Sequence, residues 1–368
     1  MNRLVQPLQG IRVLDFSTLL PGPLASLILA EAGAEVMKLE RPGRGEEMRS
    51  YPPFWDGESA TFAILNCGKS GLEIDLKAPD AAVRLEPHIR EADIVLEQFR
   101  PGVMKRLGFD YESLRRINPR LIYCSITGYG QEGPKSDRAG HDLNYIGDSG
   151  LLDLAHGTGE APVIPPVLAA DIAGGSYPAV MNILLALRQR DLTGEGVYLD
   201  IAMAENLFPF AFWAWGEGQL SGNWPSSGKG LLTGGSPRYH LYPAKCGRLV
   251  AVAALEDKFW DRFCAAIGLV DPGGEDEALI SKVGHLIGQK PAEAWEEIFA
   301  TANCCCTTVR TLAEAMRDIH FLARGVFRYQ VQNQAGKTMR ALPVPVMPVF
   351  RKPPGMAKSA PVVRKKNG

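Results

Sequence analysis

The sequence has 368 residues, of which 46% are hydrophobic and 22% charged, and its 40 basic and 41 acidic residues nearly cancel. This composition is typical of a globular protein, and the length suggests two lobes rather than a single core. The net charge of −1 provides no overall field that would attract nucleic acid. We therefore expect a globular protein without a nucleic acid partner.

Seven cysteines, at positions 67, 124, 246, 264 and 304–306, form no Cys-x-x-Cys pair. An odd number of cysteines without such a pair predicts reduced thiols. Reduced thiols, together with the lack of an apolar leader in residues 1–7, favour a cytoplasmic location. Three adjacent cysteines cannot easily turn their sulfurs toward one ion, so no metal site is predicted at 304–306. No stretch has the length expected of a membrane span.

The first half of the chain alternates short apolar runs with loops and helix-like segments. Residues 11–16 predict a strand, 24–32 a helix and 35–40 a second strand, which is the order of a parallel βαβ unit. No Gly-x-Gly-x-x-Gly follows the first strand, so a nicotinamide cofactor is poorly supported. Further strands are expected at 72–77, 92–97 and 121–126. Parallel strands of this kind bind ligands in the loops at their carboxyl ends.

The second half predicts more helices and a separate lobe. An apolar helix is expected at 178–188, a strand at 197–201 and a helix-like segment at 202–220. The Gly, Ser and Pro residues of 221–235 mark a boundary. Beyond it we expect a hairpin at 239–242 and 249–253, then helices that begin at 256, 292 and 309, the last two running to 301 and 319. The predicted lobes are 1–220, completed by an extended, proline-rich arm at 324–368, and 221–323.

Two acid–base candidates lie 30 residues apart, His141 in a Gly-His-Asp sequence and Asp171 in an Ala-Asp-Ile-Ala-Gly-Gly sequence. Asp171 shortly precedes the helix-like run 176–187, where a carboxylate is stabilised and backbone N–H groups are free. Brought together, the two side chains could add and remove protons on a substrate. From the pattern alone, Asp171 can equally be a helix N-cap, and His141 with Asp142 a structural hydrogen-bonding pair.

Several blocks of the sequence occur in a specific order. They are residues 8–16 with Pro21-Gly22-Pro23, 33–40 with Arg41-Pro42-Gly43, Asn66 and Lys69 with Asp75-Leu76-Lys77, residues 99–102, and 127–131. In this order they resemble the class III CoA-transferase family (CaiB/BaiF type), which includes the α-methylacyl-CoA racemases, over nearly the whole chain. The resemblance implies an α/β fold with an open, parallel, Rossmann-like sheet in the large lobe and a smaller α+β lobe. It also implies an interlocked homodimer.

The resemblance further implies acyl-CoA substrates, bound between the large lobe of one subunit and the small lobe of the other. Asp171 matches the family's catalytic aspartate. In the transferases this residue is a nucleophile that forms a mixed anhydride and then an aspartyl-CoA thioester. In the racemases it pairs with a histidine, and the sequence around His141 is similar to the racemase form. Glu256 matches a racemase glutamate that approaches this histidine from the partner subunit.

We therefore expect racemisation or epimerisation at C2 of a 2-methylacyl-CoA by His141 and Asp171 through an enolate. The alternative is a CoA-transferase that moves CoA between an acyl-CoA and a carboxylate through Asp171. A non-catalytic CoA-binding protein is a third interpretation. No metal, redox cofactor or membrane is expected to take part, and the acyl group is not predicted.

Two sets of groups are expected to hold the substrate. Backbone N–H groups around Asp171-Ile172 and Gly174-Gly175 are expected to stabilise the enolate oxygen. Polar side chains that follow the predicted strands are expected to bind the CoA moiety through charge-assisted hydrogen bonds. These side chains, with Arg41 as the foremost candidate, are Arg41, Arg44, Asn66, Lys69 and Arg100.

Overall fold

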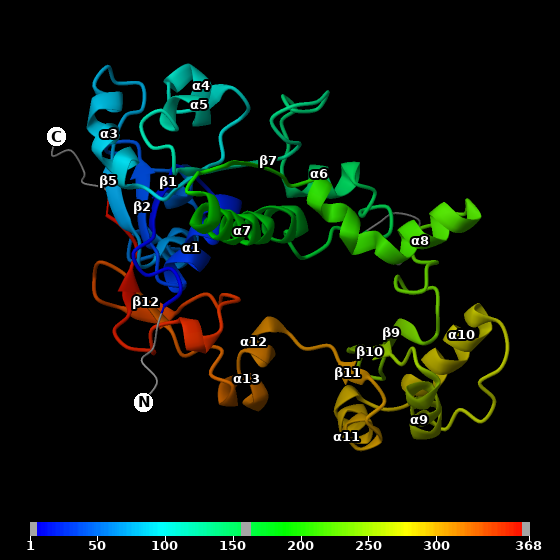
Figure 1. Cartoon of the computed structure of the whole chain (residues 1–368). Coiled ribbons are helices and arrows are strands. Elements are labelled where there is room, and N and C mark those ends of the chain that lie inside the picture. Colours follow the sequence, from blue (N-terminus) through cyan, green and yellow to red (C-terminus); the bar gives the residue numbers. More distant parts are fainter. Residues whose placement is uncertain (1–5, 156–162, 363–368) are drawn as a thin grey trace. The chain divides into compact units, whose positions relative to one another are not determined.

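The computed structural model describes residues 6–155 and 163–362 (Figure 1). The chain divides into two compact units, the first made of residues 1–149, 167–208 and 319–368 and the second of 150–166 and 209–318. Residues 209–220, which the sequence assigned to the large lobe, therefore cluster with the second unit, and that unit ends at 318.

A six-stranded sheet, all of whose pairings are parallel, forms the framework of the first unit. Its strand order is β5-β2-β1-β6-β7-β8. The strands are β1 (Arg12–Asp15), β2 (Glu35–Glu40), β5 (Ser70–Glu73), β6 (Ile94–Glu97), β7 (Ile122–Thr127) and β8 (Tyr198–Ala202). The chain adds strands to one side of β1 as far as β5 and then places β6 on the other side. The predicted α/β fold with a parallel sheet is confirmed.

Helices cover both faces of this sheet (Figure 1). One face packs against α3 (Ala81–Glu91), α4 (Val103–Leu107) and α5 (Tyr111–Leu114) in a single apolar cluster. The helix α1 (Pro21–Glu31) and the helix α7 (Tyr177–Thr193) lie against the other face. Because both faces are covered, the central strands β6 and β7 are buried along their whole length, whereas the edge strand β5 is partly exposed.

The longest helix of the described chain begins with a π-helical turn, η2 (Ala170–Ser176), and continues as α7. Together they span Ala170–Thr193, which is long and apolar enough, by length and composition alone, to cross a membrane. This differs from the expectation that no stretch would reach that length. Half of its most apolar window is buried, and it packs on β7, β8 and α1 as the core helix of a sheet does. The cytoplasmic location stays a prediction.

The second unit contains a three-stranded antiparallel sheet with the order β11-β10-β9. β9 (Tyr239–Pro243) and β10 (Leu249–Ala253) form the predicted hairpin, and β11 (Cys306–Thr308) pairs with the free side of β10. Helices pack on this sheet around an apolar core in which Trp295 stacks on Phe299 with ring centroids 5.3 Å apart. All seven cysteines lie in the described part of the chain, and each is a free thiol.

The structure differs from the helical predictions at three places. Residues 202–220 are not one helix, because a 3-10 segment at Glu205–Ala211 precedes α8 (Phe212–Ser221). The predicted helix at 309–319 is replaced by two short helices, α12 (Leu312–Ala315) and α13 (Ile319–Ala323). The sequence reading also missed α10. The remaining helices and small strands are α2 (Ala60–Asn66), α9 (Asp257–Ile267), α10 (Asp276–Ile287), α11 (Ala292–Ala302), β3 (Phe54–Trp55) and β4 (Glu58–Ser59).

The C-terminal arm returns to the first unit in a largely extended form, as the prolines predict. Its strands β12 (Gln330–Gln332), β13 (Thr338–Arg340) and β14 (Lys358–Ser359) form a small sheet. Buried Arg351 donates two hydrogen bonds, of 2.7 and 3.0 Å, to a carboxylate oxygen of Glu31 at the end of α1. Lys358 donates a third, of 2.9 Å, to the other oxygen. Two cations around one buried carboxylate thus anchor the arm to α1.

We expect Arg351→Met to lower the free energy of unfolding by about 3 kcal/mol, because it leaves Glu31 buried with one cation instead of two. Urea unfolding measures the change. The matched control is Arg90→Met, whose partner Glu86 is 44% exposed, with an expected loss below about 1 kcal/mol. Equal losses in the two variants would show that the Glu31–Arg351 pair does not anchor the arm.

Candidate active site

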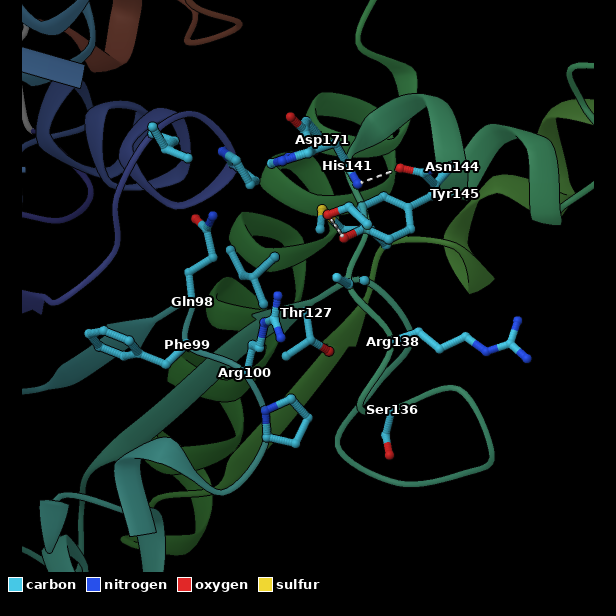
Figure 2. A pocket seen from close by; sticks show the side chains of 18 of the residues that line it. Gln98, Phe99, Arg100, Thr127, Ser136, Arg138, His141, Asn144, Tyr145 and Asp171 are labelled. Carbon is cyan, nitrogen blue, oxygen red and sulfur yellow. Dashed lines mark hydrogen bonds between the residues drawn. The ribbon is translucent and has the colours of Figure 1, made fainter. Parts of the chain in front are cut away.

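A pocket of about 510 Å³ opens in the first unit at the carboxyl ends of the parallel strands (Figure 2). Thr18 and Leu19, which follow β1, form one wall, and Gln98, Phe99 and Arg100, which follow β6, form another. The strand order reverses between these two strands. In open parallel sheets the loops diverge at such a point and leave a crevice for ligands. The topology of the sheet therefore accounts for the position of the pocket.

The structure brings the two predicted bases, His141 and Asp171, into this pocket. His141 immediately precedes α6 (Asp142–Asp148), and its backbone N–H donates to Asn144 Oδ1 at 3.0 Å. Asp171 lies in the first turn of η2. Figure 2 shows the His141 and Asp171 side chains next to each other, in agreement with the electrostatic interaction between them.

The carboxyl group of Asp171 is half-buried. Burial, and after it the negative charge of Asp142, raise the pKa of Asp171 to about 6, although His141 acts in the opposite direction. A group with a pKa near 6 can both hold and release a proton close to neutral pH, as an acid–base catalyst must. A π-helical turn such as η2 is rare, and such turns occur frequently at functional sites.

The structure decides between the two interpretations of Asp171 that the sequence left open. The N-cap position of η2 is occupied by Ala169, so Asp171 lies inside the helix and does not cap it. Asp142, which follows His141 in the Gly-His-Asp motif, accepts a hydrogen bond of 2.9 Å from the backbone N–H of Asp171. Asp142 of the Gly-His-Asp motif therefore stabilises the turn that carries Asp171, in addition to any bonds within its own motif.

The prediction that the backbone N–H groups of Asp171 and Ile172 stabilise the enolate oxygen is wrong. The N–H of Asp171 is donated to Asp142, and that of Ile172 to the carbonyl oxygen of Leu168 at 3.0 Å. The nearby glycines have a different role, since a Cβ on Gly174 would lie 2.5 Å from the carbonyl oxygen of Met203. Gly174 thus permits η2 to pack closely on the segment that follows β8.

Tyr145 of α6 also lines the pocket, and the sequence analysis did not identify it. Its hydroxyl donates a hydrogen bond of 2.6 Å to the carbonyl oxygen of Gly140. Its ring fills the space beside Gly128 and Gly140, where a Cβ would come within 2.3 and 2.8 Å of ring atoms. The two glycines, both quoted in the sequence motifs, were the signal that a large side chain packs against this backbone.

The predicted CoA-binding cations divide into two groups. Arg100 lines the pocket, together with Arg138, which the sequence analysis missed. Arg41 and Arg44 lie outside the pocket lining, on the exposed loop after β2, where Arg41 pairs with Glu47 at 2.5 Å. Among the predicted cations, the pocket contains Arg100 alone.

Lys69 and Asn66 are buried, and the structure argues against both as phosphate ligands. The Lys69 ammonium group donates to Asn66 Oδ1 at 2.8 Å, to the carbonyl oxygen of Pro23 at 3.0 Å and to Asp15 Oδ2 at 3.2 Å. These bonds use its three hydrogens, so none remains for a phosphate. Lys69 instead ties the end of β1 to the first turn of α1.

Glu256 lies in the second unit, exposed, immediately before α9. The sequence motif predicts that it approaches His141 from a partner subunit. That approach stays a prediction.

An α/β unit with an acid–base pair in a crevice at its topological switch point has the architecture of an enzyme. The sequence pattern of CoA-transferase family III matches residues 8–366, and the chain belongs to this family of enzymes.

Its relatives include both racemases and transferases. It is 33% identical over 356 residues to alpha-methylacyl-CoA racemase of Homo sapiens, covering 94% of this chain and 90% of that protein. It is 30% identical over 328 residues to acetyl-CoA:oxalate CoA-transferase of Acetobacter aceti, covering 84% and 82%. The crystal structure of a CaiB/BaiF family protein from Brucella suis superposes with a TM-score of 0.83 at 26% identity, covering 99% of this chain and 97% of that one. Family membership alone leaves the reaction open.

The raised pKa of Asp171 predicts a cost in stability. Its folded-state pKa of about 6 lies above the ordinary 3.8, so ionised Asp171 destabilises the folded protein at pH 7. We expect Asp171→Asn to raise the free energy of unfolding at pH 7 by ~1–3 kcal/mol. The gain should disappear as the pH falls from about 6 to about 4, because the folded wild type then takes up the proton. Urea unfolding across this range measures it.

The control for this measurement is Asp148→Asn on α6. Hydrogen bonds from Tyr129 and then Lys135 lower the pKa of Asp148, so its charge is favourable and its removal should bring no gain at pH 7. An Asp171→Asn gain of equal size at pH 4 and pH 7 would contradict the assigned cause.

Proposed function

We propose that this enzyme interconverts the epimers of a 2-methylacyl-CoA thioester at C2 by proton transfer between two bases. The observation that carries the proposal is the presence of His141 and Asp171 in one pocket, where the pKa of Asp171 is about 6. An aspartate used only as a nucleophile does not require a neighbouring histidine. The relationship to the human racemase over nearly the full length of both chains supports the same reaction.

The reaction begins with removal of the C2 proton, which is weakly acidic because the adjacent thioester carbonyl can accept the electron pair. His141 takes the proton, the C2–H bond electrons form the enolate, and negative charge develops on the thioester oxygen. Protonated Asp171 then gives its proton to the opposite face of C2. In the reverse direction the two residues exchange roles.

The enolate oxygen needs hydrogen-bond donors near His141. The N–H groups of Asp142 and Leu143 lie in the first turn of α6, where a helix provides no acceptor of its own. These two groups replace the donors at Asp171 and Ile172 in the proposal. Removing one such donor typically costs about 3–4 kcal/mol of transition-state stabilisation.

The CoA moiety accounts for the cations of the pocket. Arg100 and Arg138 can form charge-assisted hydrogen bonds with its phosphates. Arg41 and Arg44 remain secondary candidates, because they are exposed on a neighbouring loop. No cofactor beyond the CoA of the substrate is needed for this chemistry.

We further propose that the enzyme is an interlocked homodimer in which Glu256 of one subunit orients His141 of the other. In support, α7 exposes four large apolar side chains on one helical face, at positions i, i+4, i+7 and i+8. These residues, 44–62% exposed, are Tyr177, Met181, Leu184 and Leu185. A second copy would remove this apolar face from water.

The second candidate function is CoA transfer, which the relationship to the Acetobacter aceti transferase favours. In that reaction the Asp171 carboxylate attacks the thioester carbonyl, and CoA leaves as a thiolate, which produces a mixed anhydride. The thiolate then attacks the aspartyl carbonyl, releases the first carboxylate and forms an aspartyl-CoA thioester. An acceptor carboxylate completes the exchange. His141 has no necessary part in these steps.

Incubation of the protein with one epimer of a 2-methylacyl-CoA in D₂O tests the proposal. We expect deuterium at C2 together with loss of stereochemical purity. His141→Ala and Asp171→Ala should each slow both changes by at least about 100-fold, because each removes one proton-transfer group. His88→Ala, on α3 outside the pocket lining, is the matched control and should leave the rate unchanged.

The transferase alternative has a distinct outcome in the same preparations. Wild-type protein would show no C2 exchange but would move CoA to an added free carboxylic acid. That transfer would survive in His141→Ala and be lost in Asp171→Ala, and this result would replace the racemase proposal.

A further inference from the structure

We propose that Asp142 is a positioning residue that couples the two bases, holding the Asp171 turn through its carboxylate while its backbone continues directly from His141. The inference rests on the proposed function, since it assumes that both bases move protons. It adds a role for the Asp142 carboxylate, which is separate from the backbone N–H of that residue and which neither contacts the substrate nor exchanges a proton with it.

The burial of the Asp142 carboxylate keeps this group away from a substrate in the pocket. Its side chain is only 5% exposed, and it is not among the residues that line the pocket, whereas its neighbour His141 is. The His141 side chain of the Gly-His-Asp motif thus lines the pocket, whereas the Asp142 side chain is buried outside the pocket lining.

The contacts of Asp142 point at the start of η2. Its Oδ1 accepts the Asp171 N–H at 2.9 Å, and the backbone of Ala170 also donates to its carboxylate. The first N–H groups of a helix have no acceptor within the helix, and an anionic acceptor there also interacts favourably with the helix dipole. A carboxylate 29 residues earlier in the chain therefore fixes the turn that carries Asp171.

The charge of Asp142 acts on the same turn. The ionisable groups that interact with Asp171 are His141, Asp142 and Tyr145, and Tyr145 also interacts with Arg100. Of these, Asp142 supplies the nearby negative charge, which disfavours ionisation of Asp171, while His141 favours it. Asp142 consequently increases the fraction of Asp171 that is protonated near neutral pH, and this is the form that returns a proton to C2.

The geometric and electrostatic roles of Asp142 can be separated by two substitutions. Asparagine retains an Oδ1 that accepts the Asp171 N–H, but it removes the charge. Alanine removes both the acceptor and the charge. Asp148→Asn, at the other end of α6, removes a carboxylate that contacts Tyr129 and Lys135 and serves as the matched control.

The experiment combines ¹³C-carboxyl NMR titration of the full-length protein with the pH profile of C2 exchange in D₂O. The Asp171 resonance is assigned by its absence in Asp171→Asn. In Asp142→Asn we expect the Asp171 pKa to fall by about one unit, since a nearby like charge is lost. In the direction in which Asp171 donates, the alkaline limb of kcat should move to lower pH by the same amount, with KM unchanged. In Asp142→Ala, kcat should fall a further 10–100-fold, on the order expected when a catalytic group is displaced.

Three results would overturn the inference. One is an Asp171 titration in Asp142→Asn that matches the wild type, a second is equal kcat in the asparagine and alanine variants, and a third is the same shift in Asp148→Asn. The titration does not depend on turnover. Absence of C2 exchange in the wild type would therefore count against the proposed function, while the NMR result would still decide whether Asp142 controls Asp171.

Discussion

Between β1 and β6 the chain changes the side on which it adds strands, and the loops that leave these two strands diverge. Arg100, His141 and Asp171 are arranged around the gap between them. The loop after β6 brings Arg100, the segment after β7 leads to His141, and η2 places Asp171 beside His141. The buried bonds of Lys69 hold the end of β1 to α1 beneath this gap. The crevice is thus a product of strand order, and its polar side chains come from three separate segments of the chain.

The site retains an unfavourable charge that the surrounding fold must tolerate. Asp171 is held in a half-buried position next to another carboxylate, where its ionised form is disfavoured. Other residues of η2 hold the turn in place. The Ser176 hydroxyl donates to the carbonyl oxygen of Pro21 at 2.7 Å. The carbonyl oxygen of Gly174 accepts a hydrogen bond of 2.9 Å from the side-chain amide of Asn206. The stability of the framework therefore keeps in place a carboxyl group whose ionised form is unfavourable for folding.

The sequence predicted what depends on local pattern. Short buried strands, the hairpin at β9 and β10, and the two motifs that carry His141 and Asp171 could all be recognised from neighbouring residues. The sequence could not show that Lys69 is a buried structural cation whereas Arg138 lines the pocket. The burial of a cation depends on partners such as Asp15, which is 54 residues away from Lys69 in the chain. The same limit applies to Tyr145, which packs against Gly128 and Gly140, and to the Asp171 N–H, which is donated to Asp142 of α6. Helix α3 illustrates another limit, since it contains Pro87 and is decided by packing rather than propensity.

The π-helical turn at η2 has a consequence for the evolution of this chain by insertion and deletion. Such a turn is an α-helix that has gained one residue, so loss of a single residue there would restore regular α-helical hydrogen bonding. Everything before the deletion would then rotate by about 100° about the helix axis and move about 1.5 Å along it. Asp171 would leave the pocket although no side chain that lines the pocket had been replaced. The position of Asp171 in the pocket therefore depends on the number of residues in this turn as well as on the identity of residue 171.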